Sequence, residues 1–536
     1  EYGNYGYTDE MTGAGWQANR DNVEPEIPRR HWHLNDPGVV PNLLQTGAGS
    51  PTGIIVYEGK LLPDVFRNQV IHCDAGPNVV RAYPVQKDGA GYKAQIVNVL
   101  EGARDQWFRP ADICVAPDGS LIIADWYDPG VGGHQAGDQN RGRIYRVAPA
   151  NSPYTMPKVD VSTVEGAIEA LQSPNMSIRY AGWQKLREFD KKAEKPLAKL
   201  YKSSDNPRMQ ARALWLLSKL DKGNKYVEAA LKSANPDVRI TALRAARQLK
   251  VDISPYVKQL VNDQDPQVRR ECAIALRRST SSEAPALWAQ LARQYDGTDR
   301  WYLEALGIGA DGNWDTYYTA WLKQQGQDPL ANAAGRDIVW RARTKESVPL
   351  LAKLAGDQGA DLNQRLRYFR AFDFNPGANE KSAALLGILQ ANSGSVDVTK
   401  LALRHLDPAF VKNSPVATTA LNKLLSDVYG TPEYIELVTR YEPVSENTRL
   451  SQLALAKYNE GIGRDAARQL LKQQGASLVW AIVNGQNPDQ ATQMIGALQR
   501  VGNKESLDIL KSVALDEKRS APLRMAATRS LGGSMD

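Results

Sequence analysis

The sequence predicts a multidomain β + α protein, with a partial β-propeller of two to three blades followed by a HEAT-like α-solenoid. Its 536 residues correspond to roughly three domains of ~150 residues. The first 150 residues hold 19 of the 42 Gly and 12 of the 30 Pro, and beyond them Ala, Leu, Arg, Lys and Gln recur at helical spacing. We therefore expect the propeller part at 1–150, HEAT-like repeats at 151–325 and more divergent helical repeats at 326–536.

The first 150 residues contain short apolar runs separated by turn signals, which is typical of antiparallel sheet. The expected strands are 53–57, 69–73, 79–83, 94–100, 111–115, 120–124 and 144–147, with turns at 74–77, 87–89 and 117–119. A propeller blade takes about 40–50 residues, so this stretch holds two to three blades and cannot close a ring. We expect either that further blades come from a missing upstream segment, since the chain begins at Glu1 and not at Met, or that the fold is a different one.

The rest of the chain predicts stacked helix pairs. One theme recurs with its prolines 29 and 30 residues apart, at 206–213, 235–242 and 265–272, with a looser copy at 174–181. In each full copy Asn or Asp caps a helix, Pro occupies its first turn, and apolar residues follow at i, i+3, i+4 and i+7. Period, cap and apolar register agree, which indicates a short HEAT-type repeat.

Composition argues against several classes of protein. The net charge of +6 is small and no block of five or six like charges occurs, so we expect no nucleic-acid partner. No apolar stretch approaches the ~18 residues of a membrane span. Cys73, Cys114 and Cys272 lie in no C-x-x-C-H pattern, so we expect no covalent haem site in this chain.

Candidate chemistry is confined to the first 150 residues, which hold four of the five histidines. His31 and His33 flank Trp32 and would share one side of a strand, as a metal ligand or general base would require; a polar loop at the rim of a propeller is the alternative. The glycines of 47–53 lack the Lys and the following helix of a phosphate-binding loop, so a tight turn is expected there.

Two further clusters lie near residues 109 and 134. Arg109 precedes an expected strand and could hold a ligand carboxylate bidentately, or it could pair structurally with Asp112 or Asp125. The loop 134–143 could bind calcium through Asp138 and main-chain carbonyls, with His134 as a further candidate metal ligand. Because EF-hand spacing is absent, a plain surface loop is the alternative.

These clusters also carry a family resemblance. Residues 1–150 resemble the second half of the propeller in large membrane-bound-type dehydrogenases of planctomycetes and verrucomicrobia. The matching segments are Gly3-Asn4-Tyr5-Gly6, His31-Trp32-His33, Asp36-Pro37-Gly38, Ser50-Pro51-Thr52-Gly53, Arg109-Pro110-Ala111-Asp112, Pro117-Asp118-Gly119, Ala124-Asp125-Trp126-Tyr127 and Gly142-Arg143-Ile144-Tyr145-Arg146. That family places HEAT-like repeats and then a cytochrome c domain after the propeller.

More distantly, the Arg109-x-x-Asp112 pattern is similar to soluble aldose dehydrogenases that use pyrroloquinoline quinone (PQQ). The resemblance implies PQQ and calcium as cofactors, with Arg109 holding a quinone carboxylate. It makes Arg109, Asp112, Asp125 and Trp126 the expected cofactor site. The catalytic His of that family cannot be placed, since neither His31 nor His33 clearly fills its position.

Two hypotheses follow. The first is a fragment of a periplasmic PQQ-type sugar or alcohol dehydrogenase that passes electrons to a cytochrome c, with a sugar or polyol as substrate and the solenoid as scaffold. The second is a non-catalytic propeller–solenoid scaffold that binds a glycan or a protein partner, because solenoids present extended binding surfaces and a fold alone does not establish an activity.

Overall fold

The computed structural model describes residues 34, 36–44, 46, 49–130, 140–249, 251–326 and 328–532. The chain divides into two compact units: unit 1 comprises residues 1–354 and 361–377, and unit 2 comprises residues 355–360 and 378–536. All described strands belong to unit 1, together with the first helical repeats. The composition change near residue 150 is therefore not a boundary between compact units.

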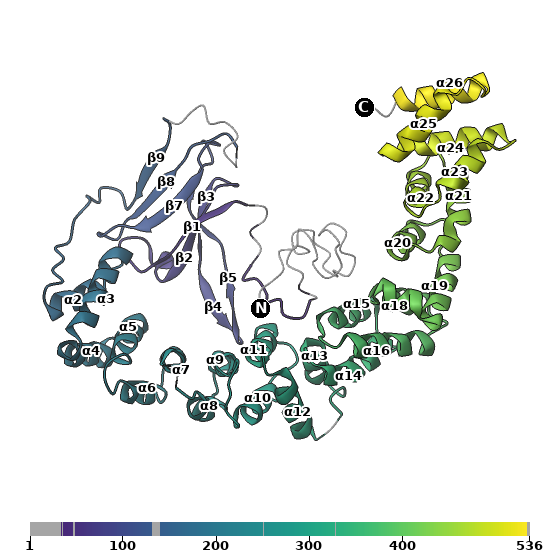
Figure 1. Ribbon diagram of the computed structural model, residues 1–536. Coiled ribbons are helices and arrows are strands. Elements are labelled where there is room, and N and C mark those ends of the chain that lie inside the picture. The colour runs from purple at the N-terminus through teal and green to yellow at the C-terminus, as the bar shows by residue number, and fades with distance from the viewer. Residues whose placement is uncertain are drawn as a thin grey trace. The chain divides into compact units, whose positions relative to one another are not determined.

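The strands of unit 1 form two meander sheets and one hairpin, which we call the β-region (Figure 1). The first sheet has the order β1-β2-β3-β6, with bounds Pro51–Tyr57, Gln69–Asp74, Val79–Tyr83 and Val97–Glu101. The second has the order β7-β8-β9, with bounds Pro110–Val115, Leu121–Asp125 and Arg143–Val147. Strands β4 (Val85–Asp88) and β5 (Gly91–Ala94) pair as the hairpin. All pairings are antiparallel, as predicted.

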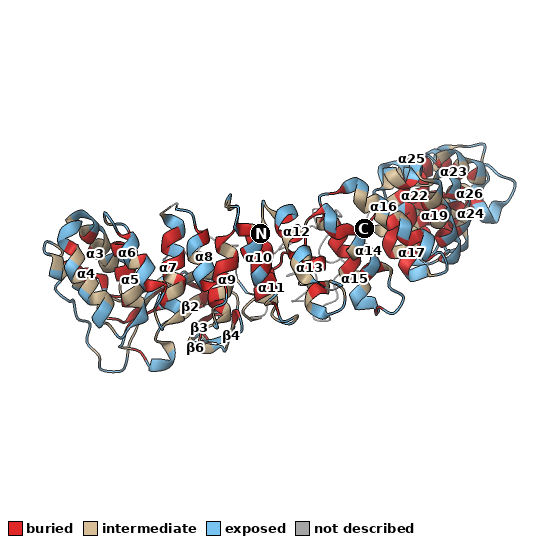
Figure 2. Ribbon diagram, turned by 90° about the horizontal axis from the view of Figure 1, so that it is seen from below, coloured by how far each residue is buried: buried red, intermediate tan, exposed pale blue. Residues whose placement is uncertain are grey.

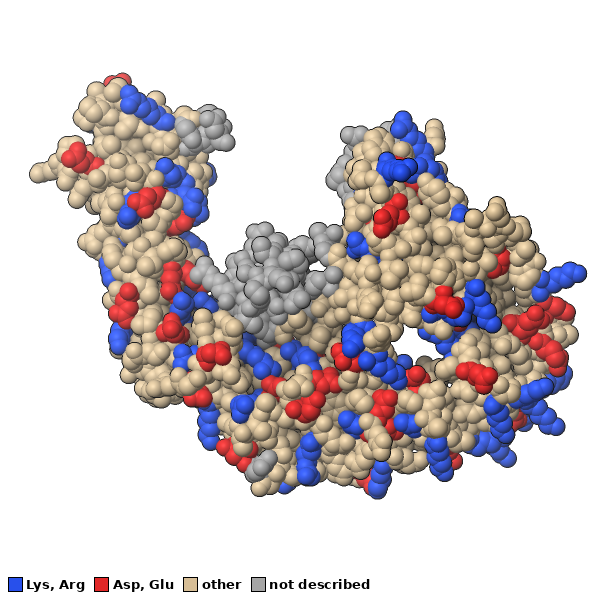
Figure 3. Space-filling view, turned by 180° about the vertical axis from the view of Figure 1, so that it is seen from behind, with Lys and Arg blue, Asp and Glu red and all other residues tan. Residues whose placement is uncertain are grey.

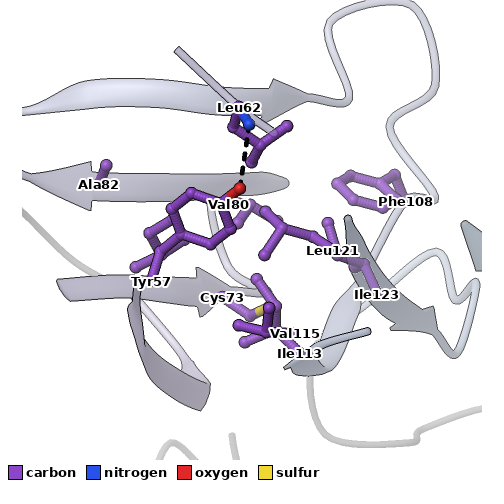
Figure 4. Packing of buried hydrophobic residues seen from close by; sticks show 11 residues of the cluster. Tyr57, Leu62, Cys73, Val80, Ala82, Phe108, Ile113, Val115, Leu121 and Ile123 are labelled. Atoms are coloured by element: carbon purple, nitrogen blue, oxygen red, sulfur yellow. Dashed lines mark hydrogen bonds between the residues drawn. The ribbon is translucent and has the colours of Figure 1, made fainter. Parts of the chain in front are cut away.

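The two meander sheets pack against each other over one apolar core (Figure 4). Ile71, Cys73 and Val80 of the first sheet meet Leu121 and Ile123 of the second, and all five are fully buried or nearly so. These sheets are small and antiparallel, and a propeller is not shown. The described strands form two meander sheets and one hairpin, whereas a closed propeller typically has four to eight blades.

The innermost strands β1 and β7 lie close together because of one glycine. A Cβ on Gly53 would lie 2.7 Å from the Cα of Asp112, so any other residue would push the strands apart. The Thr52 hydroxyl donates to the Pro110 carbonyl at 2.7 Å across the same contact. In the core, the buried Tyr57 hydroxyl accepts from Leu62 N at 2.9 Å and donates to Gly119 O at 2.8 Å.

The helices of unit 1 form paired layers (Figure 1). Their bounds are α2 Val164–Leu171, α3 Met176–Phe189, α4 Lys191–Ser203, α5 Pro207–Leu217, α6 Asn224–Ala230, α7 Pro236–Gln248, α8 Ser254–Leu260, α9 Pro266–Ala275, α10 Ala284–Ala292, α11 Arg300–Ala310, α12 Trp314–Gln325, α13 Ala333–Arg341, α14 Val348–Gly356 and α15 Leu362–Ala371. The last two residues of α14 are assigned to unit 2. The helices α5, α7, α9, α11, α13 and α15 stack in sequence order and form what we call the inner layer, together with α3. Buried residues lie where neighbouring helices face each other (Figure 2).

Unit 2 is helical throughout its described residues. Its helices are α16 Ala378–Ala391, α17 Val396–Arg404, α18 Pro408–Asn413, α19 Pro415–Asp427, α20 Pro432–Tyr441, α21 Asn447–Ala456, α22 Gly461–Lys472, α23 Ala476–Val483, α24 Pro488–Val501, α25 Lys504–Leu515 and α26 Ala521–Gly532. The contacts α20·α22, α22·α24 and α24·α26 continue the repeat pattern within this unit. No described helix has the length and apolarity that crossing a membrane requires.

The predicted helix caps are confirmed. Asn206, Asn235 and Asp265 each accept a hydrogen bond from the backbone N–H two residues on, with Pro at the first helical position. Sequence reasoning missed a second device: a side chain in the first turn reaches back six residues to a carbonyl of the preceding turn. It recurs as Arg179 to Ser173, Gln210 to Ser204, Arg239 to Ser233, Arg269 to Asp263 and Arg336 to Leu330. These bonds tie each turn to its own helix, so adjacent repeats keep one geometry.

Candidate functional site

Four of the predicted site residues can be located, and four cannot. Arg109, Asp112, Asp125 and Trp126 lie in or next to β7 and β8, within the second sheet. The other four predicted residues, His31, His33, His134 and Asp138, lie outside the described residues. Among the described residues, no cluster of three or more His, Cys, Asp or Glu side chains is arranged to hold a metal ion.

Arg109 is buried and its guanidinium binds main-chain carbonyls. Nη1 donates to Ala75 O at 2.9 Å and Gly76 O at 3.1 Å, Nε donates to Asp128 O at 3.0 Å, and Nη2 donates to Pro129 O at 3.1 Å. The side chain thereby ties the turn between β2 and β3 to the loop after β8. The alternative role predicted for it was structural pairing with Asp112 or Asp125, and the bonds are instead made to the backbone.

Asp125 is also held by internal bonds. Its carboxylate, 3% exposed as a residue, accepts from Arg109 N at 2.7 Å and Tyr127 N at 2.9 Å. The Arg143 guanidinium approaches its second oxygen, with Nε at 2.9 Å and Nη2 at 2.7 Å. Burial opposes the charge of Arg143, but the bonds to Asp125 and Asp105 raise its pKa overall.

The other two residues face outward. Asp112 lies exposed on β7, and its Oδ1 accepts from Ile113 N at 2.8 Å. Trp126 follows β8 and is about one third exposed. A quinone carboxylate needs at least two free guanidinium N–H groups pointing to open space. The Arg109 guanidinium already donates to four main-chain carbonyls. Arg109, Asp112, Asp125 and Trp126 therefore do not fit the quinone that the resemblance implies.

The structure instead shows an extensive polar contact of the β-region and the loop before β1 with the inner layer of helices. Three anchors form it, and each joins a loop of residues 34–94 to the helical repeats. We call them the Glu58 anchor, the hairpin anchor and the N-terminal anchor. None of them involves unit 2 in the described residues.

The Glu58 anchor holds the residue that follows β1. Its carboxylate is 8% exposed and lies 2.5 Å from Arg212 Nη2, 3.4 Å from Arg179 Nη1 and 3.7 Å from Arg208 Nη1. Burial, and then the charge of Arg212, lower the pKa of Arg179. Three cations from α3 and α5 thus surround one carboxylate. Removing Glu58 would leave three like charges close together, two of them on the largely buried side chains of Arg179 and Arg212.

The hairpin anchor places the tip of β4–β5 on α7, α9 and α11 (Figure 1). Lys87 Nζ lies 2.8 Å from Asp237 Oδ1 and 3.6 Å from Asp265 Oδ2. Burial works against the charge of Lys87, but the hydrogen bond and charge of Asp237, with Asp265, raise its pKa overall. The hairpin tip therefore meets the capped starts of two repeats.

The main chain of the same tip is also bound. Ala90 is fully buried: its N–H donates to Asp299 Oδ2 at 2.6 Å and its carbonyl accepts from Arg270 Nη1 at 2.6 Å. Gln267 Nε2 donates to Gly91 O at 2.7 Å. A Cβ on Gly91 would lie 2.3 Å from the Trp301 ring, so the strand can approach this helix only as glycine.

The N-terminal anchor is the described part of the cluster that the sequence singled out at 31–38. Arg300 Nη1 donates to Leu34 O at 2.9 Å, and its Nη2 donates to Asp36 O at 3.0 Å and Val39 O at 3.1 Å. The Asp36 carboxylate pairs with Arg370, Oδ1 to Nε at 2.8 Å and Oδ2 to Nη2 at 3.0 Å. The loop thus spans α11 to α15.

The turn at Gly38 completes this anchor. Gly38 N donates to Glu304 Oε1 at 3.3 Å, and Arg343 Nη2 donates to Pro37 O at 3.1 Å. Glu304 also accepts from Arg300 Nε at 2.7 Å and Arg341 Nε at 2.6 Å. Burial is the main cause of the lowered pKa of Arg300.

Sequence reasoning missed the anchor residues Glu58, Gln267 and Asp299. One signal was available: the position after the helix-starting Pro is Arg208, Asp237 or Gln267 in successive repeats. A position that varies in charge within a regular repeat indicates contact with something that is not itself repeated. The three contact Glu58, Lys87 and Gly91 respectively.

The β-region also exposes apolar side chains on the faces turned away from the shared core. Ile54 and Val56 of β1 are 66% and 38% exposed, and Ile144 of β9 is 77% exposed. Charged residues of both signs are interspersed over the face of the molecule drawn in Figure 3. Unit 2 has a separate pocket of about 470 Å³ between α16, α17 and α19, with Val396 and Val416 in its lining.

Comparison with known proteins bears on each part of the chain. Residues 224–307 match a family model described as HEAT repeats. Residues 16–151 match a family described as a domain of unknown function, DUF7133. No curated protein matches the chain. The α-solenoid prediction is therefore confirmed for the HEAT repeats, and neither matched family names a dehydrogenase.

Solved structures with similarity to the chain include three with low superposition scores. An engineered protein is 17% identical, covering 70% of this chain and 99% of its own, with a TM-score of 0.17. Human deoxyhypusine hydroxylase in complex with glycerol is 16% identical, covering 64% and 96%, with a TM-score of 0.17. A condensin subcomplex of S. pombe is 11% identical, covering 69% and 66%, with a TM-score of 0.20. Scores this low say nothing about function.

Proposed function

We propose that the protein is a non-catalytic, protein-binding scaffold in which the HEAT repeats and their neighbouring helices hold the β-region as a rigid platform. The observation that carries this proposal is the set of three anchors. The inner layer of a solenoid is a common site for partners. In unit 1 its helices instead bind the chain's own Glu58, the β4–β5 hairpin and the loop before β1.

The energetics of the anchors support rigidity. A buried ion pair adds little net stability, because desolvation offsets the attraction, but leaving one partner unpaired costs about 3–5 kcal/mol. The Asp36–Arg370 and Glu304–Arg341 pairs have side chains at most 2% exposed. Displacing the loop before β1 from the helices would break the Asp36–Arg370 pair and the bond from Gly38 N to Glu304. The Glu304–Arg341 pair lies within the helices and holds Glu304 in place for that bond, so one arrangement of the loop is strongly preferred.

The outward faces of the two sheets support binding of a protein. Ile54 and Val56 point away from the shared core, on the side of β1 opposite the buried Tyr57. Exposed apolar patches are one of the features that mark protein interaction sites. We propose further that the two meanders are neighbouring blades of a β-propeller, with β1 and β7 innermost. The dehydrogenase hypothesis stays a prediction, and its cofactor would need residues other than Arg109.

The experiment immobilises three forms of the full chain, wild type, Ile54→Asp and Leu515→Asp, and identifies the proteins that each form retains from an extract of the source cells. We expect one protein to be held by wild type and by Leu515→Asp, a control at an apolar residue of unit 2 that is 78% exposed, and to be lost with Ile54→Asp. That protein, purified, should bind wild type at least tenfold more tightly than Ile54→Asp. Equal retention by all three forms would sink the proposal. So would reduction of a dye by the purified chain with PQQ, calcium and a sugar.

A further inference from the structure

Among the described strands, the second sheet has one strand fewer than the first, although their first three strands have the same connectivity. In each sheet three strands succeed one another as an antiparallel meander, β1-β2-β3 in the first and β7-β8-β9 in the second. The first sheet then adds β6 beside β3. In the described part of the chain nothing takes the corresponding place beside β9, which pairs with β8 only.

The outer edge of β9 presents regular backbone. Its pairing with β8 runs without a bulge from Val147 opposite Leu121 to Arg143 opposite Asp125. Ala116 N donates to Ser120 O at 2.8 Å where the β7–β8 ladder begins. Antiparallel bonds alternate along a strand from such a starting pair. Counted from it, the N–H and C=O groups of Ile144 and Arg146 point away from β8.

The side chains of β9 leave this edge accessible. Arg146 lies over the sheet, with Nη2 2.8 Å from Asp118 Oδ2 and Nε 3.1 Å from Ser120 Oγ. Arg143 is engaged by Asp125 and Asp105. Ile144 is 77% exposed, more than any other large apolar residue described in the β-region. In Figure 1, β9 forms the outer margin of the β-region.

The edge of β6 in the first sheet shows what a protected edge looks like. Its pairing with β3 is interrupted by a register shift between Val80 and Arg81. Asn98 and Glu101 are exposed on it and bond to each other at 2.5 Å. Bulges and charged side chains are the usual means of protecting an edge from further pairing. By comparison, β9 is regular and apolar at its centre.

We propose that the outer edge of β9 binds an extended segment of a protein partner, which pairs antiparallel as the fourth strand of the second sheet. This inference rests on the proposed scaffold function and names the partner's element. Main-chain bonds to Ile144 and Arg146 would supply affinity, as in other strand-addition complexes. In the first sheet, Val99 and Leu100 of the fourth strand β6 pack against the shared core. In the second sheet, Tyr145 and Val147 of β9 are only partly buried against the same core. The partner segment should therefore carry alternating apolar residues that pack beside them.

The test uses a labelled synthetic peptide of residues 95–102, the sequence that already serves as a fourth strand in the first sheet. We expect it to bind the full chain saturably in fluorescence anisotropy. Ile144→Pro removes one outward N–H while leaving the β8 bonds, so it should weaken binding at least fivefold. Ile144→Thr keeps that N–H and the β-branched shape, and should bind like wild type. The peptide carrying Asn98→Pro should not bind.

Hydrogen exchange provides a second readout that does not depend on the proline variant. The amides of Ile144 and Arg146 should exchange quickly in the free chain and slow at least tenfold when the peptide is bound. No binding to wild type, or unchanged binding to Ile144→Pro, overturns the inference. If the peptide fails while Ile54→Asp still abolishes partner retention, the scaffold proposal stands and only the edge assignment falls.

Discussion

Arg370 and Asp36 form a bidentate ion pair in unit 1, with both side chains at most 2% exposed and 334 residues apart in sequence. The pair joins the first described loop of the chain to α15. Between them Arg300 and Glu304 bind the same loop through its main chain. The loop before β1 and the repeats are therefore coupled through buried charge and through main-chain hydrogen bonds.

The first prediction concerns this pair. Asp36→Asn removes the bidentate carboxylate partner of the buried Arg370 and leaves the Asp373 carboxylate in contact with it at 3.2 Å. The loss of these charge-assisted bonds should destabilise unit 1 by about 1.5–3 kcal/mol. Denaturant unfolding followed by hydrogen exchange of α15 measures it. The control is Asp508→Asn, which removes the exposed Lys504–Asp508 pair and should cost no more than about 0.5 kcal/mol. Equal effects of the two substitutions would contradict a buried anchor.

The second prediction concerns the hairpin anchor. Gly91→Ala places a methyl group 2.3 Å from the Trp301 ring, and overpacking of this kind typically costs about 1–3 kcal/mol. The β4–β5 hairpin should move away from α11, and the Ala90 amide should lose its protection against hydrogen exchange because its bond to Asp299 is broken. Gly387→Ala in α16 is the matched control, because nothing lies within 4 Å of its new methyl. It should stabilise by about 0.5–1 kcal/mol through helix propensity.

The third prediction is a pH dependence. Burial disfavours ionised Asp118, but hydrogen bonds from Ser120 and the charge of Arg146 lower its pKa to about 2. A carboxylate with a depressed pKa contributes stability above its ordinary pKa near 4, and that stability is lost as pH falls towards 2. Wild type should therefore lose more stability than Asp118→Asn between pH 4 and pH 2 in urea unfolding. Parallel pH profiles would refute the role of Asp118.

The fourth prediction concerns the three free thiols. Cys114 is exposed, whereas Cys73 and Cys272 are buried. Burial raises the pKa of Cys73 to about 12 and also raises the pKa of Cys272, so neither forms thiolate near neutral pH. A thiol reagent at pH 8 should modify Cys114 alone in the native protein and all three in denaturant. Rapid native modification of a second thiol would show that the core opens.

Local signals explain what could be predicted. The caps Asn206, Asn235 and Asp265 bond within their own first turns, so the sequence reveals them directly. The meander strands lie between turns such as 117–119 and were found for the same reason. The hairpin β4–β5 was missed, although its turn at 87–89 was seen, because its strands lack the alternating apolar pattern. Their stability comes from Asp237, Gln267 and Asp299, far along the chain.

The candidate site shows the same division. The sequence by itself determined that antiparallel strands occur between residues 51 and 147, that a capped helical repeat follows, and that Arg109 is a special residue. Only the tertiary structure decided what Arg109 binds, since its four carbonyl partners belong to two separate loops. Likewise it decided that Glu58 meets three arginines and that β9 pairs with β8 alone among the described strands. Hydrogen bonds between neighbouring residues can be predicted from the local sequence, whereas contacts between residues a hundred or more positions apart depend on how the whole chain packs.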